Sequence, residues 1–440
     1  MKKIKMMMAA ALGVLVSCGS VKSGEEAIAA SRESKVVVAY VTSWSEVMPD
    51  PQYMTHINYA FGHVNESFNG VKIDNEERLR QIVDLRKQKP ELKVLLSIGG
   101  WGSGRFSEMA ANDEYRRAFA ADCDRVVKEF ALDGIDIDWE YPTSSMANIS
   151  SSPDDTENFT LLMQDIRAAI GNEKELTLAT VASARYIDFK AILPSVDFVN
   201  IMAYDMASAP KHHSALYPSG HSGDITSDGA VTAHLKAGVP PSKLVMGMPF
   251  YGRGGDGYPS FQDYNKVGNT DTQYTEKWDE VAQVPYLADK NDTFVFGFEN
   301  PRSLAIKCQY ILDKDLLGGM YWDYSGDNEQ GDLRRTVAEN LLGKPHKAKV
   351  LVLTERGGQH GGFTDAGLRW LAAEGAKGNF SITEINNARN ITEAYLSQFS
   401  LVIQLDFPPY TWPKEAEDAF VKYIEEGRGG WIGFHHATLL

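Results

Sequence analysis

Eight short apolar runs, most of them separated by amphipathic stretches, are the feature that most restricts how this chain can fold. The apolar runs predict β-strands, and the intervening stretches, such as 76–87, 114–130, 156–170 and 303–312, predict helices. Alternation of strand and helix gives a parallel sheet, and eight repeats predict a closed (β/α)₈ barrel, the TIM barrel. The expected strands are residues 35–41, 56–61, 92–98, 134–139, 175–181, 196–204, 243–250 and 318–322.

The fourth expected strand carries an unusual acidic pattern over residues 133–142, DGIDIDWEYP. Successive side chains of a strand point to opposite faces, so Asp136, Asp138 and Glu140 share one face and the apolar residues between them the other. Same-face carboxylates lie roughly 6.5–7 Å apart, and three of them in a partly dehydrated site cannot all stay ionised. Glu140, at the accessible strand end, is expected to hold a proton and act as a general acid. The alternative is a solvated acidic edge strand.

Polar and aromatic residues stand at the ends of several other expected strands. Active sites of (β/α)₈ barrels lie at the carboxyl ends of the strands, where residues from separate strands converge. The candidates are Tyr59 and Phe61 in the second strand, Ser97, Gly99 and Gly100 in the third, Met202, Tyr204 and Asp205 in the sixth, Tyr251 and Arg253 in the seventh, and Trp322 in the eighth.

These candidates also have structural explanations. For Gly99 and Gly100 we favour a tight turn or close packing over contact with a substrate. Trp322 can fill the barrel instead of supporting a sugar ring. Tyr204 and Asp205 can end a strand and cap a helix, and Arg253 can form a structural ion pair.

Four acids at fixed spacing carry a family resemblance. Asp133, Asp136, Asp138 and Glu140 match the D-x-x-D-x-D-x-E signature of glycoside hydrolase family 18, the chitinase family, and residues 139–142 match its W-E-Y-P ending. The resemblance extends over roughly 34–344 through segments in the family's order. These segments are S-I-G-G at 97–100, N-F-T at 158–160, M-A-Y-D at 202–205, Y-G-R at 251–253 and G-M-Y-W at 319–322.

This resemblance implies a retaining hydrolase in which the 2-acetamido group of the substrate attacks its own anomeric carbon. Glu140 would act as acid and then base, Asp138 would orient the acetamido N–H, Tyr204 would hold its carbonyl oxygen, and Asp136 would share charge with Asp138. No metal or organic cofactor is implied. The implied substrate-binding residues are Tyr40, Phe61, Gly99, Gly100, Trp101, Tyr141, Met202, Asp205, Tyr251, Arg253 and Trp322.

The implied substrate is chitin or a chito-oligosaccharide, cleaved at β-1,4 bonds next to N-acetylglucosamine. One alternative is an endo-β-N-acetylglucosaminidase that cuts the chitobiose core of N-glycans, and another is an inactive glycan-binding lectin, which the presence of Glu140 disfavours. The chain departs from the family between residues 253 and 318, where only 278–286 and 294–303 resemble the usual insertion. We therefore expect a lower wall on that side of the cleft.

The first 18 residues predict a lipoprotein signal peptide. Lysines precede an apolar run over 6–16, which is shorter than the ~20 residues that a membrane-spanning helix needs. Residues 15–18, LVSC, resemble a bacterial lipobox, which implies lipidation of Cys18 and a tether over 19–33. The alternative is that Cys18 is discarded with the signal. The expected location is a membrane-anchored protein, periplasmic or on the cell surface, secreted across the inner membrane.

Charge, cysteine content and histidine spacing limit the binding partners, disulfides and metal sites that this chain can have. A formal net charge of −15 disfavours nucleic acid and anionic membrane surfaces but is compatible with a neutral polysaccharide. With Cys18 assigned to the lipobox, Cys123 and Cys308 are expected to be buried thiols and not a disulfide. No residues have metal-ligand spacing, since the adjacent His212 and His213 cannot share a helix face.

Beyond residue 345 the alternation restarts and predicts a second domain over 347–440, doubly wound and α/β. KVLVLT at 349–354 and GGWIGFH at 429–435 resemble the ThuA-like, glutamine-amidotransferase-like fold, whose pattern continues further, so we expect an incomplete domain. His360, His435 and His436 receive no assignment. The expected strands are 349–354, 380–385, 401–405 and 431–434, and the expected helices are 364–376, 391–399 and 413–426.

Overall fold

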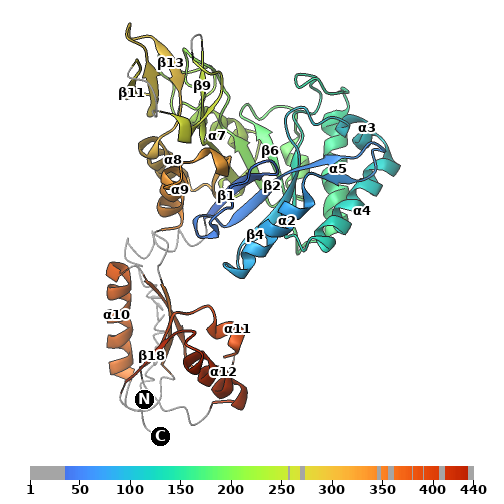
Figure 1. Cartoon of the computed structure of the whole chain (residues 1–440). Helices are drawn as coiled ribbons and strands as arrows, with labels where there is room; N and C mark the ends of the chain where they lie inside the picture. Colours follow the sequence, from blue (N-terminus) through green and yellow to red (C-terminus); the bar gives the residue numbers. More distant parts are fainter. Residues whose placement is uncertain are drawn as a thin grey trace, which may run out of the picture.

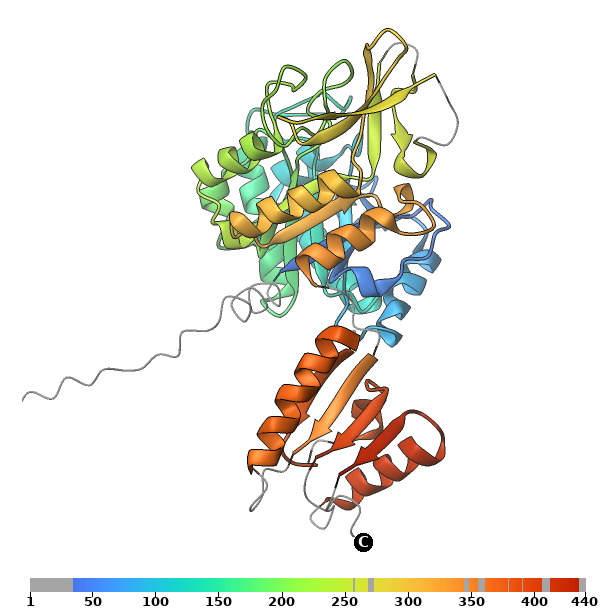
Figure 2. The same ribbon diagram turned by 90° about the vertical axis from the view of Figure 1, so that its left-hand side faces the viewer.

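The computed structural model describes residues 35–255, 258–267, 273–343, 348–354, 361–378, 380–389, 391–405 and 412–434. Its larger part is a closed barrel of eight parallel strands surrounded by helices (Figure 1, Figure 2). All eight predicted strands are confirmed, and a short antiparallel strand, β3 (Val71–Ile73), joins the edge of β2. In order around the barrel, the strands are β1 (Val36–Thr42), β14 (Gly318–Trp322), β8 (Leu244–Pro249), β7 (Phe198–Met202), β6 (Glu175–Val181), β5 (Gly134–Asp138), β4 (Lys93–Gly99) and β2 (His56–Val64), which pairs with β1.

Helices fill the connections between the barrel strands, as the parallel arrangement requires. The four predicted amphipathic helices are confirmed, the first as α2 followed by a 3₁₀ turn over Asp84–Lys87. The helices of the barrel domain are α2 (Glu76–Val83), α3 (Phe106–Ala111), α4 (Asp113–Glu129), α5 (Asp155–Ile170), α6 (Phe189–Ile192), α7 (Ser227–Lys236), α8 (Pro301–Asp313) and α9 (Asp332–Leu341). Cys123 and Cys308 are buried and unpaired, which confirms their prediction as thiols.

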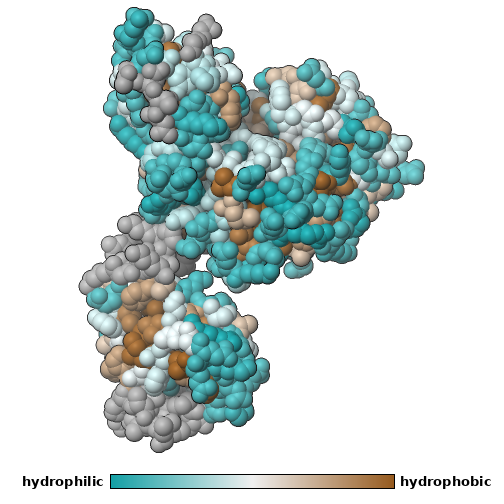
Figure 3. All heavy atoms as spheres, in the orientation of Figure 1, coloured by the Kyte–Doolittle hydropathy of each residue, from teal (hydrophilic) through white to brown (hydrophobic). Residues whose placement is uncertain are grey.

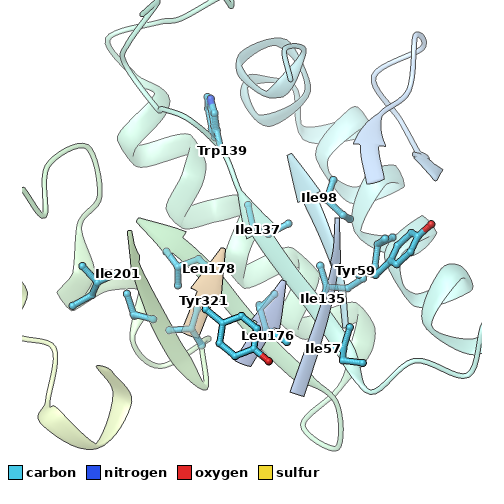
Figure 4. Packing of buried hydrophobic residues seen from close by; sticks show 14 of the residues in the cluster. Ile57, Tyr59, Ile98, Ile135, Ile137, Trp139, Leu176, Leu178, Ile201 and Tyr321 are labelled. Carbon is cyan, nitrogen blue, oxygen red and sulfur yellow. The ribbon is translucent and has the colours of Figure 1, made fainter. Parts of the chain in front are cut away.

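Strand β5 separates an apolar outer face from an acidic inner face. Ile135, Ile137 and Trp139 belong to the large core between strands and helices (Figure 4). Asp136 and Asp138 are buried on the opposite face, inside the barrel. The predicted division of this segment into two faces is therefore confirmed, and the helix layer fixes the direction in which the acids point.

Tyr59 corrects one expectation from the sequence. It lies in the outer core (Figure 4), where its hydroxyl donates to the carbonyl oxygens of Asp74 at 2.9 Å and Asn75 at 2.8 Å. Phe61, two residues later, belongs to the inner cluster instead. The pairing of β2 with β4 shifts register between Ala60 and Gly62, and such a bulge reverses the alternation of faces.

A five-stranded antiparallel sheet follows β8 and stands beyond the barrel strands on one side (Figure 1, Figure 2). Strands β9 and β10 form the earlier part of this insertion, for which the sequence showed no recognisable pattern, and the lower wall stays a prediction. These strands are too short to give a periodic signal, and no α-helix occurs among the described residues from 251 to 300. In sheet order the strands are β10 (Gln262–Asp263), β9 (Tyr251–Gly254), β13 (Phe294–Gly297), β12 (Val284–Ala288) and β11 (Thr275–Asp279).

The C-terminal region is a four-stranded parallel sheet with helices on both faces, which confirms the predicted doubly wound domain. Val350 and Val352 pack with Leu371 of α10 on one face, and Leu351 packs with Tyr423 of α12 on the other. Apolar surface gathers beside α10 in Figure 3. The sheet order is β16 (Phe380–Ile385), β15 (Ala348–Leu353), β17 (Leu401–Gln404) and β18 (Gly430–Gly433), and the helices are α10 (Gly361–Gly378), α11 (Glu393–Leu396) and α12 (Lys414–Glu425).

A buried ion pair within and just before α8 is hydrogen-bonded to Ser214, in the loop that follows β7. Lys307 and Glu299 have fully buried side chains in contact with each other. The Lys307 ammonium also donates to the carbonyl oxygen of Ser214 at 2.5 Å, and the Ser214 hydroxyl donates to Glu299 at 2.6 Å. Removal of one partner would leave the other charge buried without compensation.

Glu299→Leu should therefore lower the free energy of unfolding of the barrel by about 3–5 kcal/mol, and the double variant Glu299→Leu/Lys307→Met should recover much of the loss. Guanidinium chloride unfolding measures both effects. Lys314→Met is the matched control, since Lys314 forms only a partly exposed pair with Asp228 at 3.7 Å and should cost less than about 1 kcal/mol. Equal losses in the control and in Glu299→Leu would contradict this account.

Candidate active site

A cleft of about 870 Å³ opens at the carboxyl ends of the barrel strands. Carboxyl, phenol and aromatic groups from several strands line it, as expected for a barrel enzyme. Twelve of the residues predicted from the sequence lie in its wall, namely Tyr40, Phe61, Trp101, Asp138, Glu140, Tyr141, Met202, Tyr204, Asp205, Tyr251, Arg253 and Trp322.

Asp136 lies beneath the cleft and does not line it. Its carboxylate accepts hydrogen bonds from Tyr40 and Ser97, both at 2.8 Å, from Thr177 at 2.6 Å and from Asn200 at 3.3 Å. Burial raises its pKa, and these four hydrogen bonds oppose the rise. Asp136 therefore acts through its neighbours as a positioning residue.

Asp138 and Glu140 form the acidic centre of the cleft. Burial, followed by the charges of Glu140 and Asp136, raises the pKa of Asp138 well above its ordinary value. Burial also raises the pKa of Glu140 to about 7; a hydrogen bond from Tyr141 opposes the rise, and the charge of Asp205 adds to it. The cleft thus holds a proton near neutral pH, and Glu140 can both donate and accept it.

The Asp138 carboxyl is buried at the carboxyl end of β5. One of its buried oxygens, Oδ1, has no hydrogen-bond partner among the described residues. A buried carboxyl oxygen without a partner is costly, so a donor from a bound ligand would stabilise it. This atom is the natural position for an N–H group of a substrate.

The phenol of Tyr204 lies in the same wall. Burial raises its pKa well above the ordinary value, and the nearby charges of Asp138 and Glu140 add to the rise. Tyr204 therefore remains protonated and can donate a hydrogen bond. Among the described residues its hydroxyl contacts only the sulfur of Met320, at 3.8 Å, a weak acceptor that leaves the group available to a ligand.

Asp205 and Arg253 form a bidentate ion pair with N–O distances of 2.7 and 2.6 Å. Burial favours protonation of Asp205, but hydrogen bonds from Arg253 and His213 hold its pKa well below the ordinary value. The pair joins the end of β7 to β9, so it fixes the insertion sheet to the barrel. Arg253 therefore forms the structural ion pair that the sequence allowed and also lines the cleft, as expected of a substrate-binding residue.

Aromatic rings form two groups along the cleft. Phe61 stacks on Trp322 with 5.5 Å between centroids, and Trp44 lies against both rings at 6.3 and 6.5 Å. In the second group, Tyr141 stacks on Tyr186 at 5.5 Å. Flat rings in the wall of an acidic cleft suit the apolar faces of pyranose rings.

Gly99 and Gly100 do not line the cleft, which corrects their assignment as substrate-binding residues. A Cβ atom on Gly99 would lie 2.0 Å from the carbonyl oxygen of Asp138, and one on Gly100 would lie 2.7 Å from the Phe61 ring. Their φ angles of 132° and 91° also favour glycine. Both glycines therefore allow the close approach of β4 to Asp138 and Phe61.

Sequence reasoning did not find part of the cleft wall. Trp44 follows β1, and 182–186 follow β6, so the rule that sites lie after barrel strands could have indicated them. Ala179 and Val181 lie within β6 itself. The remaining additions lie in loops or in the insertion, where no sequence pattern marks them. The additional lining residues are Trp44, Met146, Ala179, Val181, Ala182, Ser183, Arg185, Tyr186, Met206, Ile225 and Phe261.

Asp133, the first acid of the signature, lies at the opposite end of β5. Its carboxylate accepts hydrogen bonds from Arg86 and from the backbone N–H of Val94. This contact ties β5 to β4 and the helix layer and has no part in the cleft.

Within the described ranges, no cluster of three metal-ligating side chains occurs, and no helix is long and apolar enough to cross a membrane. Cys18, the tether and the three unassigned histidines fall outside those ranges.

A closed (β/α)₈ barrel with buried carboxyls and stacked rings around an open cleft defines a carbohydrate-cleaving enzyme. The family model described as glycosyl hydrolases family 18 matches residues 36–327, and the chain belongs to this family of glycoside hydrolases. Residues 349–440 match the model named ThuA and described as trehalose utilisation, so the second domain is ThuA-like.

Relatives and solved structures agree with this assignment. Chitinase A1 of Niallia circulans is 29% identical over 70% of this chain, which spans 58% of that protein's length. Chitotriosidase-1 of Mus musculus is 31% identical over 67% of this chain and 74% of the relative. The structure of a family 18 N-acetylglucosaminidase from Paenibacillus barengoltzii is similar with a TM-score of 0.65 and 32% identity, covering 70% of this chain and 99% of that one.

The pKa of Glu140 predicts the pH dependence of hydrolysis. If Glu140 donates the proton, kcat/KM should fall above pH 7 as the acid ionises. Asp205→Asn removes a negative charge that raises this pKa, so the alkaline limb should move to lower pH. Rates with a chromogenic glycoside across pH 5–9, a range about 2 units either side of this pKa, measure the shift.

Asp188→Asn is the matched control, since Asp188 caps α6, does not line the cleft, and asparagine caps helices equally well. This variant should leave the pH profile unchanged. An alkaline limb that moves to higher pH in Asp205→Asn would contradict the assignment of Glu140 as the acid.

Proposed function

We propose that the barrel hydrolyses β-1,4 bonds at N-acetylglucosamine in chitin or chito-oligosaccharides, with retention and with help from the substrate's own acetamido group. The observation that carries the proposal is the single general acid, Glu140, beside Asp138 with its unpartnered Oδ1 in the cleft. The names of the relatives, chitinase A1 and chitotriosidase-1, support the substrate.

The acetamido group would lie between Asp138 and Tyr204. Its N–H would donate to Oδ1 of Asp138, and its carbonyl oxygen would accept from the Tyr204 hydroxyl. These two contacts would hold the carbonyl oxygen near the anomeric carbon, which replaces the protein nucleophile that most retaining glycosidases use. Both groups are available because neither has a strong partner within the described residues.

Bond cleavage would proceed with a balanced transfer of one proton. The acetamido oxygen forms a bond to the anomeric carbon while the glycosidic bond breaks, and Glu140 protonates the departing oxygen. The cyclic cation that results lies beside the ionised Glu140 and the Asp138–Asp136 pair, which stabilise its positive charge. Glu140 then removes a proton from the water that opens the ring, so the acid is regenerated.

Glu140→Gln should lower the rate of chitotetraose hydrolysis by about 10²–10⁴-fold, because glutamine fills the same space without a transferable proton. Binding of chitotetraose, measured by calorimetry, should persist. Glu114→Gln, at the start of α4, is a control that should retain full activity. Unchanged turnover in Glu140→Gln would contradict the site assignment.

A second candidate is removal of single N-acetylglucosamine units, which the name of the Paenibacillus barengoltzii structure favours. Mass spectrometry of products from chitotetraose should show chitobiose or chitotriose for internal cleavage, and mainly the monosaccharide for this second mode. A high-mannose glycoprotein tested in parallel distinguishes the endo-β-N-acetylglucosaminidase alternative, which would leave one N-acetylglucosamine on the protein. Binding to all probes without any product would indicate a lectin.

We further propose that the protein is a lipoprotein held at a membrane through Cys18, on a periplasmic or cell-surface face. The lysine-rich start, the short apolar run and the LVSC segment support this location. For the ThuA-like domain we propose a glutamine-amidotransferase-like fold, which the parallel β16-β15-β17-β18 order supports.

A further inference from the structure

The segment that follows β6 brings a cation into the cleft wall. Ser183, Arg185 and Tyr186 all line the cleft. The segment begins with a turn, in which the N–H of Ala184 donates to the carbonyl oxygen of Val181 at 3.0 Å. Thr156 of α5 then holds it in place through a hydrogen bond to the Tyr186 carbonyl oxygen at 2.9 Å.

Two residues of this segment have strained backbones. Ala184 and Tyr186 have φ angles of 56° and 75°, in the left-handed region that residues other than glycine rarely adopt. Strain of this kind persists where the surrounding structure holds it, and it is common at ligand sites. Here it flanks Arg185 on both sides.

The Arg185 guanidinium is held on one side only. Its Nε donates to the Ser183 hydroxyl at 3.0 Å, and its central carbon lies 5.7 Å from the centre of the Tyr186 ring. In the described part of the chain, its two terminal nitrogens have no hydrogen-bond partner and no carboxylate pairs with it. An arginine fixed in this way presents a planar pair of donors, the geometry that suits a carboxylate.

Each carboxyl group of the cleft has a partner or a role other than pairing with Arg185. Asp205 is paired with Arg253 through two hydrogen bonds. Glu140 is the proton donor of the proposed reaction, and Asp138 is the proposed partner of the acetamido N–H. Arg185 is thus the one arginine of the cleft wall left without a counter-charge among the described residues, in a chain whose net charge is −15.

Tyr186 links this cation to the reacting centre. Its ring stacks on Tyr141 with 5.5 Å between centroids and 15° between planes, and Tyr141 directly follows Glu140. A sugar unit bound against these two rings would lie next to the cleaved bond. A carboxylate on that sugar would face Arg185, whereas an unmodified N-acetylglucosamine has only neutral groups to offer it.

We propose that Arg185 makes the enzyme select saccharides that carry a carboxylate on a sugar next to the cleaved N-acetylglucosamine bond. This inference rests on the proposed hydrolytic function and refines its substrate class. The carboxylate could be a lactyl ether, as on muramic acid, or an acid substituent at the 6-position. Both share the chemistry that Arg185 recognises.

Three probes test the proposal: chitotetraose, 6-O-carboxymethylated chitotetraose, and a tetrasaccharide of alternating N-acetylglucosamine and N-acetylmuramic acid. The wild-type kcat/KM should be higher for at least one acidic probe than for chitotetraose, and the preferred probe identifies the position of the carboxylate. Arg185→Gln should reduce that preference by about fivefold, a factor typical of an exposed charge pair. The rate with chitotetraose should fall by a smaller factor than the rate with the preferred acidic probe.

Two further variants and the salt dependence complete the test. Lys190→Gln removes an exposed cation of α6 that does not line the cleft, and it should leave the preference intact. Arg185→Lys should retain part of the preference, and added salt should weaken it in the wild type. Equal rates on acidic and neutral probes, or equal losses on both in Arg185→Gln, would overturn this proposal. No cleavage of any probe would instead overturn the proposed function.

Discussion

The buried carboxylate of Asp136 is the interaction on which the rest of the site depends. Tyr40, Ser97, Thr177 and Asn200 donate to it from β1, β4, β6 and β7. A charge inside a barrel is unfavourable unless hydrogen bonds surround it, so these four donors and the acid require one another. The network fixes the depth and direction of β5, and therefore the position of the two acids that follow at alternate residues.

Much of this architecture could be predicted because it follows from periodicity. Apolar runs marked the barrel strands, and alternation along β5 placed Asp138 and Glu140 in the cleft. The same rule failed for Tyr59, because the register shift between Ala60 and Gly62 reverses the faces of β2. A bulge depends on the pairing of two strands, and a single strand's sequence does not reveal it.

The contacts made by the remaining site residues could not be predicted, because most of them depend on the conformation of loops. Arg185 and Tyr186 follow β6 in a segment whose shape comes from left-handed residues and from a hydrogen bond to Thr156. Gly99 and Gly100 could be identified from the sequence as candidate residues. Their role depends on their distances to Asp138 and Phe61, which the sequence does not show. Sequence patterns identify residues that alternate, whereas tertiary contacts decide what an irregular segment does.

The insertion sheet begins and ends between two neighbouring elements of the barrel. It starts at Tyr251, two residues after β8, and ends at Gly297, shortly before α8. Because both attachment points lie at the same place in the fold, the sheet can lengthen, shorten or exchange its outer strands without any shift in the register of β5. The shape of this wall can consequently change without a change in the catalytic residues, and the ion pair of Asp205 and Arg253 is a contact that holds the insertion sheet to the barrel.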